Sequence, residues 1–287
     1  MVHSLRILLS KADAKCIKEF AFAGMVLTPA LVQICVDHLR VSQIEVLYGM
    51  TESEFITTGP VSDSTTLQEN HDVTVGKPIP GCIARLYSAD GQTILPRGVP
   101  GQLHVTGDRL ASDYFTGHSE QFYEVDGRGW FNTGDQAVID HGDQIFVVDR
   151  DKDIIVRGGE NKSPARIEYV LSMLQELADV DTQIVGLAND TAGEAPVAVV
   201  EKEIILEEAQ LFQSTVRTVL GNMYVPGDVI SLPSLHVNDY RRTSSGKIIK
   251  GKLAELATKG SSSQPQEQRA LTGEQITAAW ASVLRVN

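Results

Sequence analysis

The pattern of apolar and polar positions predicts alternating strands and helices towards both ends of the chain. Apolar runs predict short strands, and apolar residues at helical spacing predict amphipathic helices. The strands fall at 4–9, 20–24, 45–48, 183–187 and 195–200, and the helices at 164–177, 207–220 and 247–256. Thr28 and Pro29 open one more helix, because a hydroxyl N-cap followed by proline favours a helix start.

Between residues 73 and 150 the pattern changes to short β-rich runs punctuated by glycine and proline. Pairs such as Pro80-Gly81 and Pro100-Gly101 are typical of turns between antiparallel strands. Residues 144–149 predict one more strand at the end of this stretch. The segment is therefore predicted to fold as a series of hairpins.

The end of the chain changes character again. Residues 258–270 are polar and predict a flexible linker. Residues 271–287 then carry the apolar positions of one amphipathic helix, including Trp280 and Leu284. Because a lone helix of this length is marginal in water, the chain is expected to stop inside a further domain.

Composition narrows the classes of function. The 287 residues are 42% hydrophobic and 22% charged, which is ordinary for a globular chain. The net charge of −12 argues against a general nucleic-acid binder, which usually carries a basic face. The three cysteines form no CxxC pair, so neither a zinc site nor a disulfide framework is indicated. No segment has the pattern of a signal peptide or a membrane span, which favours a cytoplasmic protein.

Four segments add chemistry to this picture, in a fixed order along the chain. They read Tyr48-Gly49-Met50-Thr51-Glu52, Trp130-Phe131-Asn132-Thr133-Gly134-Asp135, Asp149-Arg150-Asp151-Lys152-Asp153-Ile154-Ile155-Val156-Arg157-Gly158-Gly159-Glu160-Asn161 and Arg242-Thr243-Ser244-Ser245-Gly246-Lys247. Together they resemble the adenylate-forming superfamily of acyl-CoA synthetases, luciferase-like ligases and nonribosomal peptide synthetase adenylation domains. The resemblance covers roughly Ser4 to Leu256.

This resemblance implies a fold and a reaction. The fold is α/β and α+β: part of a large N-terminal domain with a β-rich, distorted barrel-like subdomain, followed by a small mobile α+β C-terminal domain. The reaction is that of a ligase, in which a carboxylate attacks the α-phosphorus of ATP and a thiol then displaces AMP. The implied ligands are ATP, Mg²⁺, a small carboxylic acid, and CoA or carrier-protein phosphopantetheine as the thiol acceptor. The first half-reaction depends mainly on positioning and electrostatics.

The first segment is matched to nucleotide and metal binding in the family. Tyr48 offers a flat face near the adenine, Gly49 allows close backbone approach, and Thr51 offers a hydroxyl donor to a phosphate. Glu52 offers a hard carboxylate oxygen for Mg²⁺ held jointly with ATP phosphates. Taken alone, the same five residues are also typical of a strand end with a tight turn.

The other segments supply three more candidate residues. Asp135, expected at the end of a strand that carries Trp130, matches the residue that binds the ribose hydroxyls. Arg150 matches an arginine that contacts ribose and phosphate, and Lys247 matches the lysine that reaches the α-phosphate and carboxylate during adenylation. Each also has a plainer interpretation: an Asx-turn for Asp135, a surface ion pair for Arg150 and a solvated lysine for Lys247.

Further features concern the second half-reaction. Lys152 matches the hinge between the two domains, and Gly158 and Gly159 match the loop that nears the thiol in the thioester-forming pose. The run 153–161 resembles acyl-CoA synthetases more than amino-acid-activating domains, which favours a carboxylic or fatty acid. The helix at 271–287 resembles the first helix of a carrier domain, which points to a multidomain enzyme of secondary metabolism.

The resemblance covers the family's C-terminal half, because no Ser/Thr/Gly-rich phosphate loop precedes Tyr48. Residues 1–149 correspond to the C-terminal part of the large AMP-binding domain and 150–257 to the small lid domain. Residues 258–270 correspond to the linker and 271–287 to the truncated start of a carrier-like domain. Three interpretations stay open: a fragment of an AMP-forming acid ligase, a catalytically silent nucleotide-binding or docking module, and a CoA ligase completed by another chain.

Overall fold

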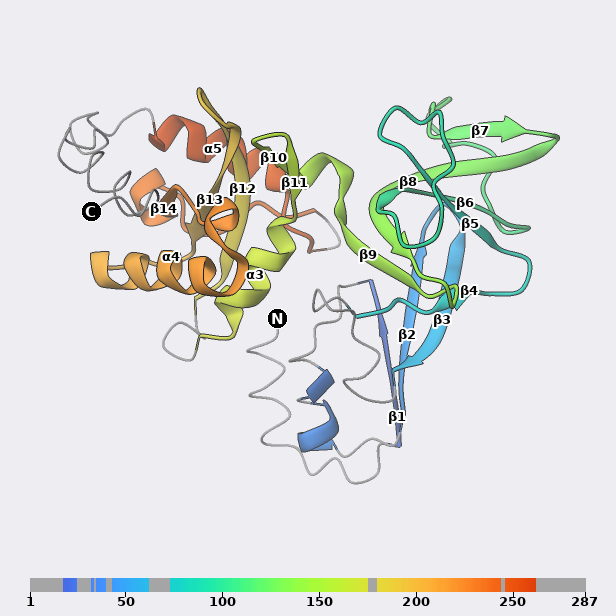
Figure 1. Ribbon diagram of the computed structural model, residues 1–287, viewed down its shortest axis with the longest axis horizontal. Helices are drawn as coiled ribbons and strands as arrows, with labels where there is room; N and C mark the ends of the chain where they lie inside the picture. The colour runs from blue at the N-terminus through green and yellow to red at the C-terminus, as the bar shows by residue number, and fades with distance from the viewer. Residues whose placement is uncertain are drawn as a thin grey trace, which may run out of the picture.

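The computed structural model describes residues 18–24, 32–33, 35–39, 43–61, 73–174, 180–243 and 246–261. Four predicted features lie wholly or partly outside the described residues: the strand at 4–9, the helix start at Thr28-Pro29, the part of the linker at 262–270, and the helix at 271–287. Strands and helices of the described part are arranged around three sheets (Figure 1).

The first sheet has the order β1-β2-β3-β4. It consists of β1 (Glu19–Ala23), β2 (Gln43–Met50), β3 (Glu54–Val61) and β4 (Lys77–Pro78). The first pair, β1 and β2, is parallel, whereas β2 forms an antiparallel hairpin with β3. A π-helical turn, η1 (Cys35–Leu39), precedes β2. The predicted strands at 20–24 and 45–48 are thus confirmed as β1 and β2.

The second sheet, which we call the barrel sheet, has the order β5-β6-β8-β7, with β9 paired to β8. Its strands are β5 (Ile83–Tyr87), β6 (Gly101–Thr106), β7 (Phe122–Val125), β8 (Arg128–Ile139) and β9 (Ile145–Arg150). All its pairings are antiparallel, as the glycine and proline punctuation predicted. One apolar core lies under it and includes Leu103, Phe131 and, from β3, Ile56, so the first two sheets share a core.

The third sheet forms a small lobe, defined here as the described residues of 155–261. Its order is β11-β10-β13-β12, with β14 parallel to β13. The strands are β10 (Ile155–Arg157), β11 (Glu160–Lys162), β12 (Thr182–Asn189), β13 (Gly193–Val200) and β14 (Asp228–Ser231). The helices are α3 (Pro164–Ser172), α4 (Leu206–Leu220) and α5 (Lys250–Ser261), with short 3₁₀ turns η5 (Asn222–Tyr224) and η6 (Pro233–Leu235).

Helices cover both faces of the small lobe's sheet. Along β13 the side chains alternate, so Ala198 and Val200 pack with α3 and α4, while Val197 and Val199 pack with α5 and Tyr240. This two-sided burial explains the nearly continuous apolar run of β13. The expected α+β fold of this region is therefore confirmed, with β12 and β13 at the predicted strands and α4 at the predicted helix.

Helix α5 differs from its prediction at both ends. It begins at Lys250 rather than Lys247, because Ile248 forms a β-bridge with Arg242 and cannot join the helix. It extends to Ser261, into the segment predicted as linker, and Gly260 packs closely against Leu235 of η6. Tertiary packing thus extends a helix through a polar sequence. No described helix is both long and apolar enough to cross a membrane.

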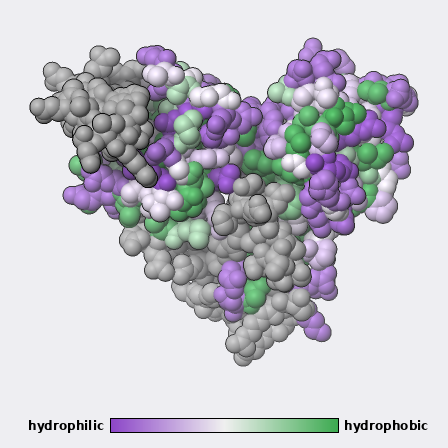
Figure 2. Space-filling view, viewed as in Figure 1, coloured by the Kyte–Doolittle hydropathy of each residue, from purple (hydrophilic) through white to green (hydrophobic). Residues whose placement is uncertain are grey.

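The 3₁₀ turn η3 (Asp151–Asp153) joins the barrel sheet to the small lobe. It follows directly on β9, the last strand of the barrel sheet, and leads into β10. In Figure 1, β9 runs from the barrel sheet towards the small lobe, and Figure 2 shows a notch between these two parts on the viewed face.

His104 gives the barrel sheet an acid-sensitive position. The side chain is buried, its Nδ1 lies 2.7 Å from the Tyr123 hydroxyl, and its Nε2 has no hydrogen-bond partner. Burial lowers the pKa of His104 to about 4, whereas the unfolded chain takes up this proton near pH 6.5. We therefore expect the contribution of His104 to stability to be constant above about pH 6.5 and to fall by up to about 3 kcal/mol between pH 6.5 and 4.

Urea unfolding of the His104→Gln variant across this pH range measures the effect. The variant should lose most of the acid-dependent decline, since glutamine takes up no proton there. His118, exposed and paired with Asp113, provides the matched control, and His118→Gln should keep the decline. Identical pH dependence in wild type and His104→Gln would show that His104 is not responsible.

Candidate active site

One cavity of about 330 Å³ gathers most of the predicted site residues. It lies between the end of β2, strands β8 and β9, the start of α3 and the loop before α5. Its volume is in the range of small-molecule sites. The lining residues are Gly24, Leu47, Tyr48, Gly49, Met50, Thr51, Glu52, Val73, Val75, Asp135, Val147, Asp149, Arg150, Ala165 and Lys247.

Asp135 is the most enclosed charged group of this cavity. The sequence predicted it at a strand end, but β8 continues to Ile139, so Asp135 lies inside a 12-residue strand. The strand can continue because Gly134 adopts a φ of 71° and the register shifts after Gln136, which together bend β8 at the cavity. The Thr133 hydroxyl accepts a hydrogen bond from the Asp135 backbone N–H at 3.1 Å.

Both carboxylate oxygens of Asp135 have partners. Oδ2 accepts a hydrogen bond from the Tyr48 hydroxyl at 2.5 Å, and Oδ1 lies 2.9 Å from Arg150 Nε. Burial raises the pKa of the Asp135 carboxyl, while the Tyr48 hydrogen bond and the charges of Arg150 and Lys247 oppose that rise. Burial, followed by the negative charge of Asp135, raises the pKa of Tyr48 well above its usual value. Tyr48 therefore stays a hydrogen-bond donor at neutral pH.

The sheet register explains why Arg150 reaches Asp135. The two residues are direct partners in the antiparallel pairing of β8 with β9. Asp135 is 7% exposed as a side chain and Arg150 is 49% exposed, so the guanidinium combines a buried partner with access to the open cavity. The plainer interpretation of Arg150 as a surface ion pair therefore does not fit this geometry.

Gly49 has a structural role that differs from the expected one. A Cβ at this position would lie 2.1 Å from the Glu54 carbonyl oxygen, which no side chain can tolerate. The register between β2 and β3 shifts between Tyr48 and Gly49, and Glu54 itself has a φ of 54°. The missing side chain is thus required by the neighbouring strand, in addition to leaving room in the cavity.

Thr51 and Glu52 lie on the turn that follows β2. Thr51 is exposed and Glu52 half-buried. Glu52 Oε1 accepts a hydrogen bond from the Tyr114 hydroxyl at 2.6 Å, and burial, followed by this bond, raises the pKa of Tyr114 to about 12. Tyr114 was not predicted as a site residue, because its only signal in the sequence is an aromatic pair, Tyr114-Phe115, within a polar loop.

The donor set at Glu52 suits a metal that is shared with a ligand. Among the described residues, no cluster of three or more His, Cys, Asp or Glu could hold a metal ion. Mg²⁺ is commonly bound through one or two carboxylates together with substrate phosphates, and Glu52 at the edge of the cavity retains a second carboxylate oxygen. The residues present therefore fit an ion brought in with a phosphate ligand.

Lys247 comes from the small lobe into the same cavity. A tight turn positions it: the Thr243 N–H donates to the Lys247 carbonyl at 2.7 Å, and the Lys247 N–H donates to Thr243 Oγ1 at 3.1 Å. Gly246 has a φ of 84°, which favours glycine. The side chain is exposed, and its positive charge acts on Asp135.

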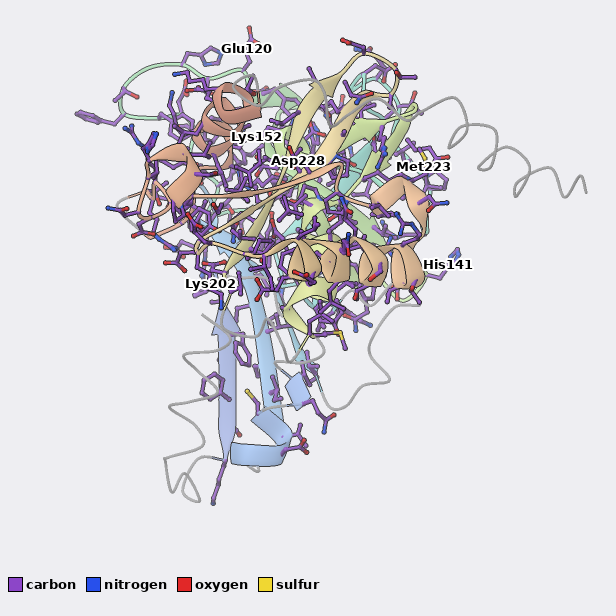
Figure 3. All side chains as sticks on the ribbon, turned by 90° about the vertical axis from the view of Figure 1, so that its left-hand side faces the viewer. Glu120, His141, Lys152, Lys202, Met223 and Asp228 are labelled. Carbon is purple, nitrogen blue, oxygen red and sulfur yellow. The ribbon has the colours of Figure 1, made fainter. Side chains whose placement is uncertain are left out.

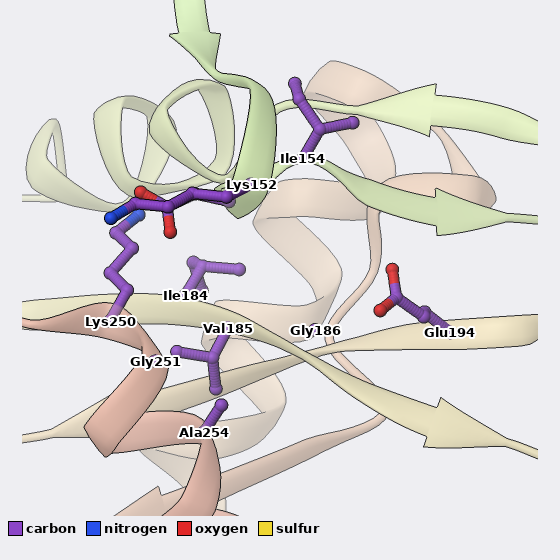
Figure 4. A pocket seen from close by; sticks show the side chains of 10 residues that line it. Lys152, Ile154, Ile184, Val185, Gly186, Glu194, Lys250, Gly251 and Ala254 are labelled. Carbon is purple, nitrogen blue, oxygen red and sulfur yellow. The ribbon is translucent and has the colours of Figure 1, made fainter. Parts of the chain in front are cut away.

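Lys152, Gly158 and Gly159 lie elsewhere. Lys152, labelled in Figure 3, lines a second, smaller cavity of about 80 Å³ beside α5 (Figure 4), together with Asp153 and Lys250. The turn η3 thus places the Lys152 side chain away from the cavity that Arg150 and Lys247 line. Gly158 and Gly159 form the turn of the β10–β11 hairpin, with φ values of 61° and 81°.

Comparisons with known proteins show which enzymes the chain is similar to. A family model described as AMP-binding enzyme matches residues 2–115. A mitochondrial medium-chain acyl-CoA ligase of Bos taurus is 28% identical over 248 residues, which are 86% of this chain and 39% of that protein. The chain therefore spans less than half the length of this relative.

Solved structures of similar fold show the same partial coverage. The o-succinylbenzoate CoA synthetase of Bacillus subtilis, in complex with its acyl-adenylate intermediate, aligns with a TM-score of 0.70 and 24% identity over 88% of this chain and 49% of that one. McyG A-PCP, complexed with phenylalanyl-adenylate, aligns with a TM-score of 0.72 and 24% identity over 91% of this chain and 48% of that one.

Proposed function

Because this chain belongs to the adenylate-forming superfamily and spans part of its length, we propose that it contributes to AMP-forming activation of a carboxylic acid. A carboxylate oxygen attacks the α-phosphorus of ATP, pyrophosphate leaves, and an acyl-adenylate forms. The observation that carries this proposal is one cavity lined by Tyr48, Asp135 and Arg150 together with Lys247 of the small lobe.

The enclosed end of this cavity suits a ribose. The Asp135 carboxylate has two acceptor oxygens, and a vicinal diol offers two hydroxyl donors. The Tyr48 hydroxyl and Arg150 guanidinium hold this carboxylate in place. A bound ribose would replace or share the Tyr48 bond, which frees the phenol ring to pack beside the base. Leu47, Val73 and Val147 supply an apolar wall for that base.

The open end suits phosphate chemistry. Arg150 is half-exposed and Lys247 is exposed, so Lys247 can approach a phosphate freely, and Arg150 can do so while its Nε stays paired with the buried Asp135. Cations aimed at the oxygens around the α-phosphorus stabilise charge that develops as the carboxylate attacks. Mg²⁺, held by Glu52 together with the phosphates of ATP, would add Lewis-acid stabilisation when bound, while Thr51 would donate a hydroxyl to a phosphate oxygen.

Transfer to a thiol would complete the reaction. The thiol sulfur attacks the acyl carbonyl carbon of the adenylate, and AMP leaves. We place Lys152 at the hinge of the lobe movement this requires, because it lies in the turn η3 between β9 and the small lobe. The Gly158-Gly159 turn would then approach the thiol arm of CoA or of a carrier-protein phosphopantetheine. A carboxylic or fatty acid substrate fits the acyl-CoA-synthetase-like run 153–161, and a role in secondary metabolism fits the carrier-like sequence of 271–287.

Acid-dependent ATP–pyrophosphate exchange tests this proposal. It is run on this chain and on the chain extended upstream by the corresponding segment of an acyl-CoA ligase, with a panel of fatty, aromatic and amino acids. We expect exchange that requires one class of acid. Absence of exchange from both proteins, with AMP binding retained, would overturn the proposal in favour of a silent nucleotide-binding module. CoA or a carrier protein added to an active sample then identifies the acceptor.

A further inference from the structure

Two glutamines of the barrel sheet hold the first residue of the turn η3. Asp151 Oδ1 accepts a hydrogen bond from Gln136 Nε2 at 2.7 Å, and Oδ2 accepts one from Gln102 Nε2 at 2.9 Å. The two glutamines are direct partners in the pairing of β6 with β8. Two neighbouring amides therefore match the two oxygens of one carboxylate, which is a more specific arrangement than a single surface contact.

Asp149, two residues before Asp151, is bound to the small lobe instead of the barrel sheet. Its Oδ2 accepts hydrogen bonds from the Ser163 hydroxyl at 2.7 Å and from the Ala165 backbone N–H at 3.1 Å. Ala165 lies in the first turn of α3, where backbone N–H groups have no partner within the helix. A strand of the barrel sheet thus supplies the carboxylate that caps a helix of the small lobe, and Ser163 is buried at this contact.

In the junction, by which we mean residues 149–153 between the barrel sheet and the small lobe, each of the two aspartates is bound to the part of the molecule on the far side of the other. Asp149 belongs to β9 but is bound to the small lobe, whereas Asp151 lies beyond β9 but is bound to the barrel sheet. A backbone rotation between Arg150 and Asp151 would separate Asp151 from its glutamines. A rotation at Lys152 would carry Ser163 and Ala165 away from Asp149. Each pivot in the junction is therefore restrained by its own hydrogen bonds.

The restrained orientation is the one that brings Lys247 to the cavity. Asp149 and Ala165 themselves line that cavity, together with Asp135 and Lys247. We propose that Gln102, Gln136 and Ser163 are positioning residues, which act through Asp151 and Asp149 to hold the small lobe where Lys247 faces the site of Asp135. The consequence for catalysis rests on the proposed function, but the effect on lobe orientation does not.

We call the hydrogen bonds of Asp151 with the two glutamines, and of Asp149 with Ser163 and Ala165, the latch. Exchanging a carboxylate and an amide within it tests its role. Gln136→Glu places a second carboxylate against Asp151 and should loosen the junction. Adding Asp151→Asn should restore it, because the asparagine amide can donate to the introduced carboxylate while its carbonyl still accepts from Gln102. Gln92→Glu, in the exposed loop between β5 and β6 of the barrel sheet, makes the same chemical change away from η3 and is the matched control. Ser163→Ala tests the second contact independently.

The readout is the distance between the lobes in the full chain. Nitroxide labels are attached through bioorthogonal side chains at exposed positions Glu124 on β7 and Glu207 on α4, and pulsed dipolar spectroscopy gives the distance distribution. We expect one main distance in wild type and Gln92→Glu, a second population in Gln136→Glu and in Ser163→Ala, and its disappearance in the double variant. An unchanged distribution in both Gln136→Glu and Ser163→Ala, or no restoration in the double variant, would overturn the latch.

Exchange kinetics separate the latch from the proposed function. In a sample with pyrophosphate exchange, Gln136→Glu should lower kcat about tenfold, with little change in KM for ATP, because one charge-assisted hydrogen bond is lost. Recovery of kcat in the double variant is a result that a general loss of stability would not produce. A wild type without exchange would reject the proposed function, yet the distance distributions would still decide the latch.

Discussion

Replacing Asp135 by asparagine is expected to weaken AMP binding about 100-fold, because a hydrogen bond to a charged group contributes roughly 1.5–3 kcal/mol. Asparagine keeps the shape of the side chain but offers one acceptor oxygen in place of two. The substitution also removes the negative charge, which pairs with Arg150 Nε at 2.9 Å and strengthens the hydrogen bond that Asp135 accepts from the Tyr48 hydroxyl. Isothermal titration of AMP into the chain and its variant measures the change.

The chain provides a matched control for this experiment. Asp143 also pairs with an arginine, Arg97, at 2.6 Å, but both side chains are exposed and lie outside the cavity. Asp143→Asn should therefore leave the affinity for AMP unchanged. Circular dichroism of both variants checks that the fold is kept. Equal affinity in wild type and Asp135→Asn would rule out the ribose role of Asp135.

Replacing Lys247 by alanine is expected to lower the rate of pyrophosphate exchange by about 10²–10³-fold, the usual effect of removing one group that stabilises transition-state charge. AMP affinity should change far less, because Asp135 and Arg150 hold the nucleoside without Lys247. This split between binding and turnover distinguishes a residue that acts on the reacting phosphate from one that anchors the ligand. Exchange is assayed in whichever protein, native or extended, shows activity.

Lys252→Ala is the matched control for Lys247→Ala. Lys252 lies on α5, is exposed, and pairs with Glu255 at 3.0 Å within the same helix. Its removal should change neither exchange nor AMP affinity. If Lys247→Ala instead lost exchange and AMP affinity to the same extent, the lysine would be a binding residue rather than one that acts during the reaction.

Much of the fold followed from local patterns in the sequence. A continuous apolar run placed β13, helical spacing placed α4, and turn residues placed the hairpins of the barrel sheet. These elements are determined by residues close in sequence. The resemblance to known motifs also named several residues that line the cavity, and it could do so because each motif keeps its own spacing within one segment.

Features that depend on contacts distant in sequence were missed or wrong. The bond between Tyr48 and Asp135 joins two sheets, and the cap of α3 by Asp149 joins two lobes. Neither partner carries a local signal for the other. The direction of the turn η3, which the sequence does not specify, places Lys152 in a different cavity from Arg150 and Lys247. The end of α5 likewise depends on packing against η6.

Lysine footprinting tests whether Lys247 of the small lobe and the Asp135 site form one nucleotide cavity. The chain is acetylated with and without saturating AMP, and the rate at each lysine is followed by mass spectrometry. We expect AMP to slow the modification of Lys247 and to leave the rate unchanged at Lys202, which is exposed outside the cavity. If the rate at Lys247 stayed the same while AMP was bound, the two residues would not share a nucleotide cavity.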